Sequence, residues 1–189
     1  MDKVKLAIVG AGIWGENHAS IYQAHPFAET VAICDQNEAK AREVATRVGI
    51  SQVYTDYRQM FEQSGCDAVA IVTTDFLHGD IAVAAAEHKQ HILIEKPLAT
   101  TQEDVFRSVK AVRANGVRAM VDLHNRWSPP FNATKQAVDR GDLGEVYSGY
   151  FRLNDVKWVA TDMLSWAAQS SILWFLGSHS VDTLSWMMN

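Results

Sequence analysis

Three groups of residues in this sequence could do chemistry together. A glycine-spaced run, Gly10-Ala11-Gly12-Ile13-Trp14-Gly15, is followed by an isolated acid at Asp35 and, further along, by the tripeptide Glu95-Lys96-Pro97. Free amides at a glycine-rich helix start bind a diphosphate, an acid after the next strand binds ribose hydroxyls, and a lysine can exchange a proton with a substrate. The three groups together predict a dinucleotide site with a reactive lysine beside it.

Each glycine of the run has its own expected role. Gly10 permits the tight turn from strand to helix, Gly12 lets the main chain approach the diphosphate, and Gly15 lets the helix pack on the sheet. We expect Ile13 and Trp14, between the last two glycines, to contact the dinucleotide as well. Glycines that serve only as turns are the alternative, which the acid after the next predicted strand makes the weaker one.

Asp35 distinguishes between the two nicotinamide cofactors. A carboxylate at this position accepts hydrogen bonds from both ribose hydroxyls and repels a 2′-phosphate, so the sequence favours NAD over NADP. Arg42, which could attract such a phosphate, is expected on the outer face of its helix.

Lys96 is the candidate for proton transfer. Oxidation of a carbinol needs a group that takes the hydroxyl proton, and lysine can do so only when burial or a neighbouring cation lowers its pKa from roughly 10.4. Lys96 follows a predicted strand, at the sheet edge where doubly wound sheets bind ligands, and Pro97 fixes the main chain behind it, with a cis bond as one option. A lysine that only solvates a loop is the alternative.

The elements that must position these residues alternate along the chain. Short apolar runs predict strands over 4–9, 31–34, 68–72, 92–94 and 119–123. Between them, helices are expected over 13–24, 38–48, 57–62, 80–88 and 100–115, the last opened by a capping box of Thr100 and Glu103. This alternation predicts an α/β fold with a doubly wound parallel sheet.

The pattern changes after residue 123. A helix is expected over 129–140, a strand of an antiparallel sheet over 144–153, and a last helix over 178–187. One strand and two helices do not enclose a core of their own. We therefore expect a dinucleotide-binding domain over 1–123 and a truncated second α/β domain over 124–189.

Composition excludes several classes of protein. The 189 residues carry a formal net charge of −5, and no basic stripe is present to neutralise the phosphates of a nucleic acid. The two cysteines, Cys34 and Cys66, indicate neither a disulfide framework nor a zinc site, which favours a reduced, cytoplasmic protein. Neither a secretory leader nor a stretch apolar enough for a bilayer is recognised, so no membrane partner is expected.

With these residues, the chain resembles the Gfo/Idh/MocA family of oxidoreductases over essentially its whole length. Members have a Rossmann domain followed by a larger α/β domain with an open antiparallel sheet, through which homo-oligomers commonly form. The matching segments are Gly10–Gly15 with His18-Ala19, Thr73–His78, His91–Leu98, Arg126-Trp127 with Pro130-Phe131, Gly141–Gly144 and Gly177–Asp182.

The resemblance implies roles for individual residues. Lys96 is expected to contact both cofactor and substrate, and His179 to act as a catalytic acid/base or to orient the substrate. Further cofactor contacts are expected from Thr73, Thr74, Asp75, His78, Glu95 and Arg126. Substrate contacts are expected from Lys96, His124, Asn125, His179 and Asp182. No metal is expected, because His179 and Asp182 offer only two ligands.

One departure from the family pattern affects His179. Many family dehydrogenases carry an aspartate four residues before this histidine, and this chain has Phe175. Phenylalanine can neither orient the imidazole nor stabilise its protonated form. Either Lys96 carries the proton transfer with His179 in a lesser part, or the chemistry differs from simple alcohol oxidation; a purely structural His179 is the other alternative.

These inferences favour an NAD-dependent dehydrogenase that transfers hydride between nicotinamide and a hydroxyl carbon of a sugar, inositol or related polyol. The substrate class comes from the resemblance alone. Two alternatives stay open: an NAD-dependent glycoside hydrolase of the same family, and a non-catalytic dinucleotide-binding or sensing module, which Phe175 favours.

Overall fold

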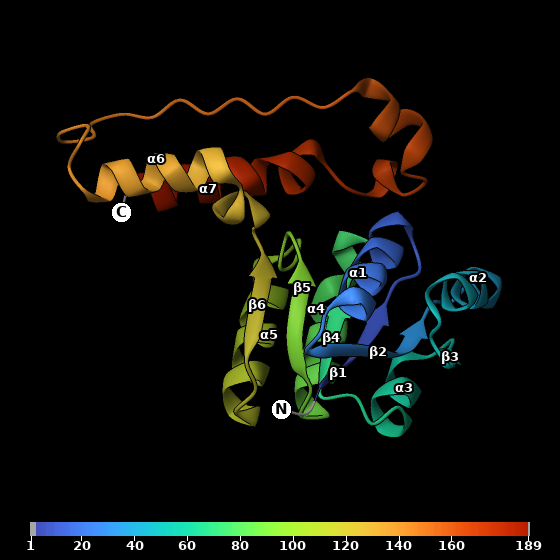
Figure 1. The fold of residues 1–189 in the computed structure, drawn as a ribbon. Coiled ribbons are helices and arrows are strands. Elements are labelled where there is room, and N and C mark those ends of the chain that lie inside the picture. Colours follow the sequence, from blue (N-terminus) through green and yellow to red (C-terminus); the bar gives the residue numbers. More distant parts are fainter. Residues whose placement is uncertain (1–2, 189) are drawn as a thin grey trace. The chain divides into compact units, whose positions relative to one another are not determined.

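The structure, a computed structural model, describes residues 3–188 and divides into two compact units, one up to Val121 and one from Asp122 (Figure 1). The outer ends of the two predicted domains, residues 1 and 189, lie outside the described residues. The boundary expected after residue 123 stays a prediction.

The first unit is built on one six-stranded sheet with the order β3-β2-β1-β4-β5-β6 (Figure 1). The pairs β1–β2, β1–β4, β2–β3 and β4–β5 are all parallel. The strands are β1 Val4–Val9, β2 Ala28–Cys34, β3 Gln52–Tyr54, β4 Ala68–Ile71, β5 His91–Glu95 and β6 Ala119–Asp122. The strand order reverses between β1 and β4: β2 and β3 lie on one side of β1, and β4, β5 and β6 lie on the other. Sheets of this kind bind ligands at such a switch point, at the carboxyl ends of the strands. The predicted parallel α/β fold is confirmed.

Helices separate the strands, and the central strands β1 and β4 are buried on both faces toward their carboxyl ends. The helices are α1 Ile13–Ala24, α2 Glu38–Val48, α3 Tyr57–Gln63, α4 His78–Glu87 and α5 Gln102–Asn115. Ile8 and Val9 are neighbours on β1, yet they belong to two different buried clusters, because successive strand residues point to opposite faces. A strand buried on both sides reads as a continuous apolar run, which is why β1 could be predicted from the sequence.

Strand β3, Gln52–Tyr54, was not predicted. It is three residues long, pairs only with β2 at the edge of the sheet, and is only partly buried. So short a segment shows no clear apolar alternation, and its pairing depends on the neighbouring strand rather than on its own sequence.

The predicted cap of α5 is wrong by one residue. The helix begins at Gln102, and the N-cap is Thr101, whose hydroxyl oxygen accepts from the Asp104 amide at 3.1 Å. The same hydroxyl donates to the Asp104 carboxylate at 2.7 Å. Two threonines followed by two acids allow two registers, and the expected pair of Thr100 and Glu103 is the other one.

The second unit contains the helical turn η2 (His124–Trp127) and two longer helices, α6 (Pro129–Asp139) and α7 (Ser178–Met188), which pack together. The strand expected over 144–153 is absent from this structure. A strand is stabilised by hydrogen bonds to a neighbour, and no strand of the described residues pairs with this segment. The antiparallel sheet stays a prediction.

Both cysteines lie buried and free in the first unit. Burial and the nearby charges of Asp35 and Asp56 raise the pKa of the Cys34 thiol to about 12, so it stays protonated at neutral pH. Within the described part of the chain, none of the helices combines the length and the apolar character that a membrane span needs.

Candidate functional site

The glycine turn joins β1 to α1, and its three glycines meet different surroundings. Gly10 has φ of 109°, and a Cβ there would lie 2.4 Å from the Val72 carbonyl oxygen. A Cβ at Gly15 would lie 1.8 Å from the carbonyl oxygen of Gly10, whereas one at Gly12 would meet no atom within 4 Å. The protein's own main chain therefore requires Gly10 and Gly15, while Gly12 faces open space, as a glycine that lets a ligand approach would.

The start of α1 is open in the same way. Gly12 is the N-cap and has no side chain to accept a bond from the amides of the first turn. Ile13 and Trp14 follow it and are 65% and 54% exposed. Unsatisfied amides with the positive end of the helix dipole form a site for an anion, so this turn can hold a diphosphate.

Asp35 follows the end of β2, and its carboxylate is directed at the glycine turn. One oxygen accepts a hydrogen bond from the Ala11 amide at 2.8 Å, and the other accepts from the Asn37 amide at 2.8 Å. Each carboxylate oxygen has a second acceptor position, so these bonds leave the group able to bind hydroxyls. The predicted ribose-binding acid and the predicted diphosphate turn are thus in direct contact.

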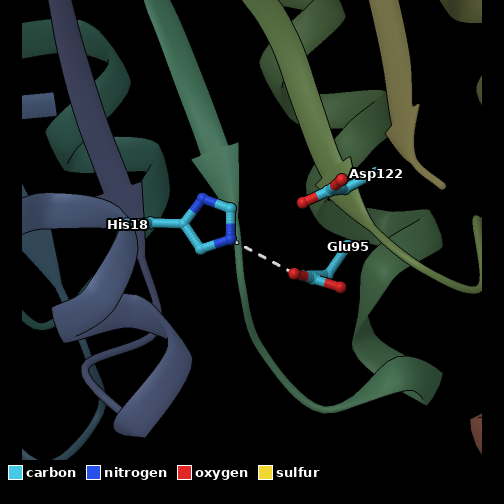
Figure 2. A group of neighbouring side chains, drawn as sticks. All are labelled: His18, Glu95 and Asp122. Carbon is cyan, nitrogen blue, oxygen red and sulfur yellow. Dashed lines mark hydrogen bonds and ion pairs between the residues drawn. The ribbon is translucent and has the colours of Figure 1, made fainter. Parts of the chain in front are cut away.

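The Glu95-Lys96-Pro97 turn ends β5, and its Lys96–Pro97 bond is cis. Glu95 accepts a hydrogen bond from the Lys96 amide at 3.2 Å through one carboxylate oxygen. Its other oxygen lies 3.2 Å from Nε2 of His18 (Figure 2). Nδ1 of His18 lies 2.8 Å from the Tyr22 hydroxyl. Two side chains of α1, those of His18 and Tyr22, are therefore connected through Glu95 to the main chain of Lys96.

The Glu95 carboxyl is held in its charged form. Burial acts to raise its pKa, and the hydrogen bond from His18, the charges of His18 and Lys96 and the Lys96 amide together outweigh burial, so the pKa lies below its usual value. A carboxylate is therefore fixed beside the main chain of Lys96, itself half-buried.

Asp122, the last residue of β6, is drawn with His18 and Glu95 in Figure 2. His18, Glu95 and Asp122 each offer one potential ligand atom, all within 4.8 Å of one another. An imidazole and two carboxylates can serve a divalent cation, but such groups are also common without one, and the bond between His18 and Glu95 already accounts for part of the arrangement. The expectation of no metal stays a prediction.

His78 begins α4 and is fully buried. Its Nδ1 lies 2.7 Å from the Pro97 carbonyl oxygen and its Nε2 lies 3.2 Å from that of Thr73. Burial lowers the pKa of His78, although both carbonyls and the charges of Asp75 and Glu95 act in the opposite direction. His78 thus joins the loop after β4 to the lysine turn, and its predicted contact with the cofactor stays a prediction.

The loop after β4 carries the other predicted cofactor residues. Thr73 and Thr74 are partly buried, and Asp75, the first residue of the helical turn η1 (Asp75–Leu77), is 3% exposed. Asp75 therefore presents little of its side chain to solvent. The roles of all three stay predictions.

In the second unit, five predicted residues gather where η2 meets α7. The ring centroids of His124 and His179 are 4.6 Å apart, and the Asn125 amide donates to the Thr183 hydroxyl at 3.3 Å. Nε of Arg126 donates to the Asp182 carboxylate at 3.0 Å, and a second guanidinium nitrogen donates to its other oxygen. The gathered residues are His124, Asn125, Arg126, His179 and Asp182. Arg126 and Asp182, expected to bind different ligands, thus bind each other.

Phe175, which the resemblance indicated as a departure from the family pattern, packs edge-on against Trp166, with ring centroids 6.3 Å apart. His179 is 6% exposed, and the imidazole of His124 contacts it with the two ring planes tilted by 57°. A phenyl ring at this position offers His179 no hydrogen bond, as the sequence indicated.

Sequence reasoning missed the pairing of His18 with Glu95. His18 and Tyr22 are four residues apart, so they lie on one face of α1, and this spacing was a usable sign that their side chains meet. Their link to Glu95, 77 residues along the chain from His18, depends on how the fold brings α1 and the end of β5 together, and it has no sign in the local sequence.

The comparisons with known proteins agree with this geometry. The family model GFO_IDH_MocA, described as "Oxidoreductase family, NAD-binding Rossmann fold", matches residues 4–123. The chain belongs to this family.

Relatives within the Gfo/Idh/MocA family include dehydrogenases of inositols and sugars. The scyllo-inositol 2-dehydrogenase (NAD(+)) of Bacillus subtilis is 33% identical over 153 residues, which are 79% of this chain and 45% of that protein. The levoglucosan dehydrogenase of Pseudarthrobacter phenanthrenivorans is 30% identical over 204 residues, 100% of this chain and 52% of that protein.

A solved structure is similar along the whole chain. The WlbA dehydrogenase of Bordetella pertussis, in complex with NADH and UDP-GlcNAcA, has a TM-score of 0.86 and 29% identity, and the match covers 100% of this chain and 56% of that one. The chain therefore spans about half the length of the relatives it matches.

Proposed function

We propose that this chain is the cofactor-binding part of an NAD-dependent dehydrogenase that acts on a CH–OH group of a sugar, inositol or related polyol. The observation that carries the proposal is the Asp35 carboxylate, held by the amide of Ala11 at the edge of the open glycine turn. The names of the two curated relatives, a scyllo-inositol and a levoglucosan dehydrogenase, support the substrate class.

The residues of the chain divide the task. Amides at the start of α1 hold the diphosphate, and Asp35 binds the adenosine ribose and disfavours a 2′-phosphate. NAD, when bound, supplies the hydride acceptor. Lys96 takes the hydroxyl proton of the substrate, and His179 holds or protonates the substrate.

Other residues complete both parts of the proposal. Beyond the glycine turn and Asp35, cofactor contacts come from Ile13, Trp14, Thr73, Thr74, Asp75, His78, Glu95, Lys96 and Arg126. Substrate contacts come from Lys96, His124, Asn125, His179 and Asp182. We also propose that residues 124–189 begin a larger α/β domain with an antiparallel sheet through which copies associate, and that the protein works in the cytoplasm.

Calorimetry with NAD and NADP tests the cofactor. We expect NAD to bind and NADP to bind at least about tenfold more weakly, because a 2′-phosphate would meet the Asp35 carboxylate. A folded sample that gives no heat with either nucleotide would contradict the proposal.

Formation of NADH from a panel of inositols and sugars tests the reaction. We expect Lys96→Met to abolish it, whereas Lys110→Met, which removes an exposed lysine of α5, leaves it unchanged. Equal loss in both variants would show that Lys96 has no special role.

A second candidate is a dinucleotide-binding module without turnover. The packing of Phe175 on Trp166, in place of an acid near His179, favours it. Tight NAD binding without NADH formation over the whole panel would support this candidate against the dehydrogenase.

A further inference from the structure

We infer that His18 is a positioning residue for Lys96 and acts on it through Glu95. The meaning of this role rests on the proposed function, since it is that function which makes Lys96 a reactive group. The contacts themselves all lie in the first unit.

The three hydrogen bonds form one chain with consistent donors. Nδ1 of His18 lies 2.8 Å from the Tyr22 hydroxyl, Nε2 of His18 lies 3.2 Å from one oxygen of Glu95, and the Lys96 amide donates to the other oxygen of Glu95 over 3.2 Å. A neutral imidazole with its proton on Nε2 satisfies every one of these contacts. An imidazolium satisfies them as well, with Nδ1–H as donor to the Tyr22 hydroxyl, and in both forms Nε2–H is the donor to Glu95.

The position of His18 in the fold shows which two parts of the site these hydrogen bonds connect. His18 is 9% exposed and lies about one turn into α1, the helix whose start forms the diphosphate site. Glu95 is the last residue of β5, and Lys96 follows it directly. The chain of bonds thus ties the lysine turn to the helix of the glycine turn.

Burial makes this tie strong. His18 and Glu95 have side chains that are 11% and 13% exposed, so water competes little for their bond. Loss of the imidazole leaves one Glu95 oxygen without its donor and frees the carboxylate to turn away from the Lys96 amide. Misplacement of a reacting group by about 1 Å can cost about 10²-fold in rate.

Amide hydrogen exchange at Lys96, measured by NMR, reports on the tie directly. We expect exchange to be about tenfold faster in His18→Phe, which keeps a ring but removes the donor, and closer to the original rate in His18→Gln, which restores an N–H donor. The control is His25→Phe, at the exposed C-terminal end of α1. Unchanged exchange in His18→Phe would overturn the inference.

Binding and turnover separate this inference from the proposed function. We expect the NAD dissociation constant of His18→Phe to stay within about threefold of the original, since the glycine turn and Asp35 are untouched, while kcat for NADH formation falls at least about tenfold. A protein that does not bind NAD at all would contradict the proposed function, whereas the exchange result would still decide the link between His18 and Lys96.

A measurement on the unaltered protein covers the case in which His18→Phe does not fold. NMR of ¹⁵N-labelled histidine identifies which ring nitrogen carries the proton. A proton on Nε2 of His18, alone or on a doubly protonated ring, supports the inference. A neutral ring with its proton on Nδ1 could not donate to the oxygen of Glu95 that faces Nε2, and this result would overturn the inference.

Discussion

The carboxylate of Asp35 accepts a hydrogen bond from the main-chain amide of Ala11 at 2.8 Å, which joins the end of β2 to the middle of the glycine turn. The second oxygen of the same group accepts from Asn37 at 2.8 Å, so both oxygens are held in place. The orientation of the acid is thereby fixed in advance, and binding of a ribose would cost little side-chain entropy.

Asp35→Asn tests this arrangement, because it removes the charge and replaces one acceptor oxygen with a donor. We expect NAD affinity to fall about tenfold and the preference for NAD over NADP to shrink, since a 2′-phosphate no longer meets an anion. Calorimetry with both nucleotides measures the two effects. Glu87→Gln, which removes an exposed carboxylate at the end of α4, is the control and should change neither. An unaltered preference in Asp35→Asn would show that the acid does not face the ribose.

The glycine turn offers a matched pair of substitutions. A Cβ at Gly15 would lie 1.8 Å from the Gly10 carbonyl oxygen, so Gly15→Ala should lower the free energy of unfolding by about 3 kcal/mol. Gly12→Ala meets no atom within 4 Å, so it should leave stability nearly unchanged and weaken NAD binding instead. Thermal unfolding and calorimetry on both variants separate the effects. Full NAD affinity in a stable Gly12→Ala protein would place the ligand elsewhere.

How much of this molecule could be predicted depended on how local each signal was. The buried strand β1 and the helix α1 have the same bounds as predicted, because both signals are local in the sequence. The strand is a continuous apolar run, and the helix ends before the histidine that precedes Pro26. Strand β3 was missed because three half-buried edge residues have no pattern of their own.

The candidate site shows the same limit. The glycines, Asp35 and Lys96 could be identified from residue type and spacing, whereas the bond from the Ala11 amide to Asp35 depends on how two strand ends approach each other. The residues expected near the substrate were named from a resemblance, and the pairing of Arg126 with Asp182 across 56 residues was not foreseen. Long-range packing, rather than local sequence, decides such contacts.

His78 gives the protein a dependence of stability on pH. Its pKa in the folded protein lies below the usual 6.5, mainly because the ring is buried, even though Asp75 and Glu95 lie nearby. The unfolded chain therefore binds the proton more readily, so this contribution to stability is complete above pH 6.5 and is lost as the pH falls below it through the folded pKa. Urea unfolding between pH 5 and about 8 should show this decline.

Replacement of His78 removes the titrating group and so tests its share. We expect His78→Gln to be less stable at neutral pH, because the Pro97 and Thr73 carbonyls lose their buried partner, and to lose part of the decline in acid. His25→Gln, an exposed histidine at the end of α1, should keep the original slope. A slope that survives unchanged in His78→Gln would mean that another group titrates there.

Two substitutions at the start of α5 distinguish the N-cap observed in the structure, Thr101, from the one predicted from the sequence, Thr100. The Thr101 hydroxyl accepts from the Asp104 amide and donates to the Asp104 carboxylate, so Thr101→Ala should lower the free energy of unfolding by about 1 kcal/mol. Thr100→Ala, one residue earlier, should cost clearly less, because Thr100 precedes the N-cap. Thermal unfolding of the two variants gives the comparison. The larger loss in Thr100→Ala would mean that the capping box has the register read from the sequence, with Glu103 as its acid.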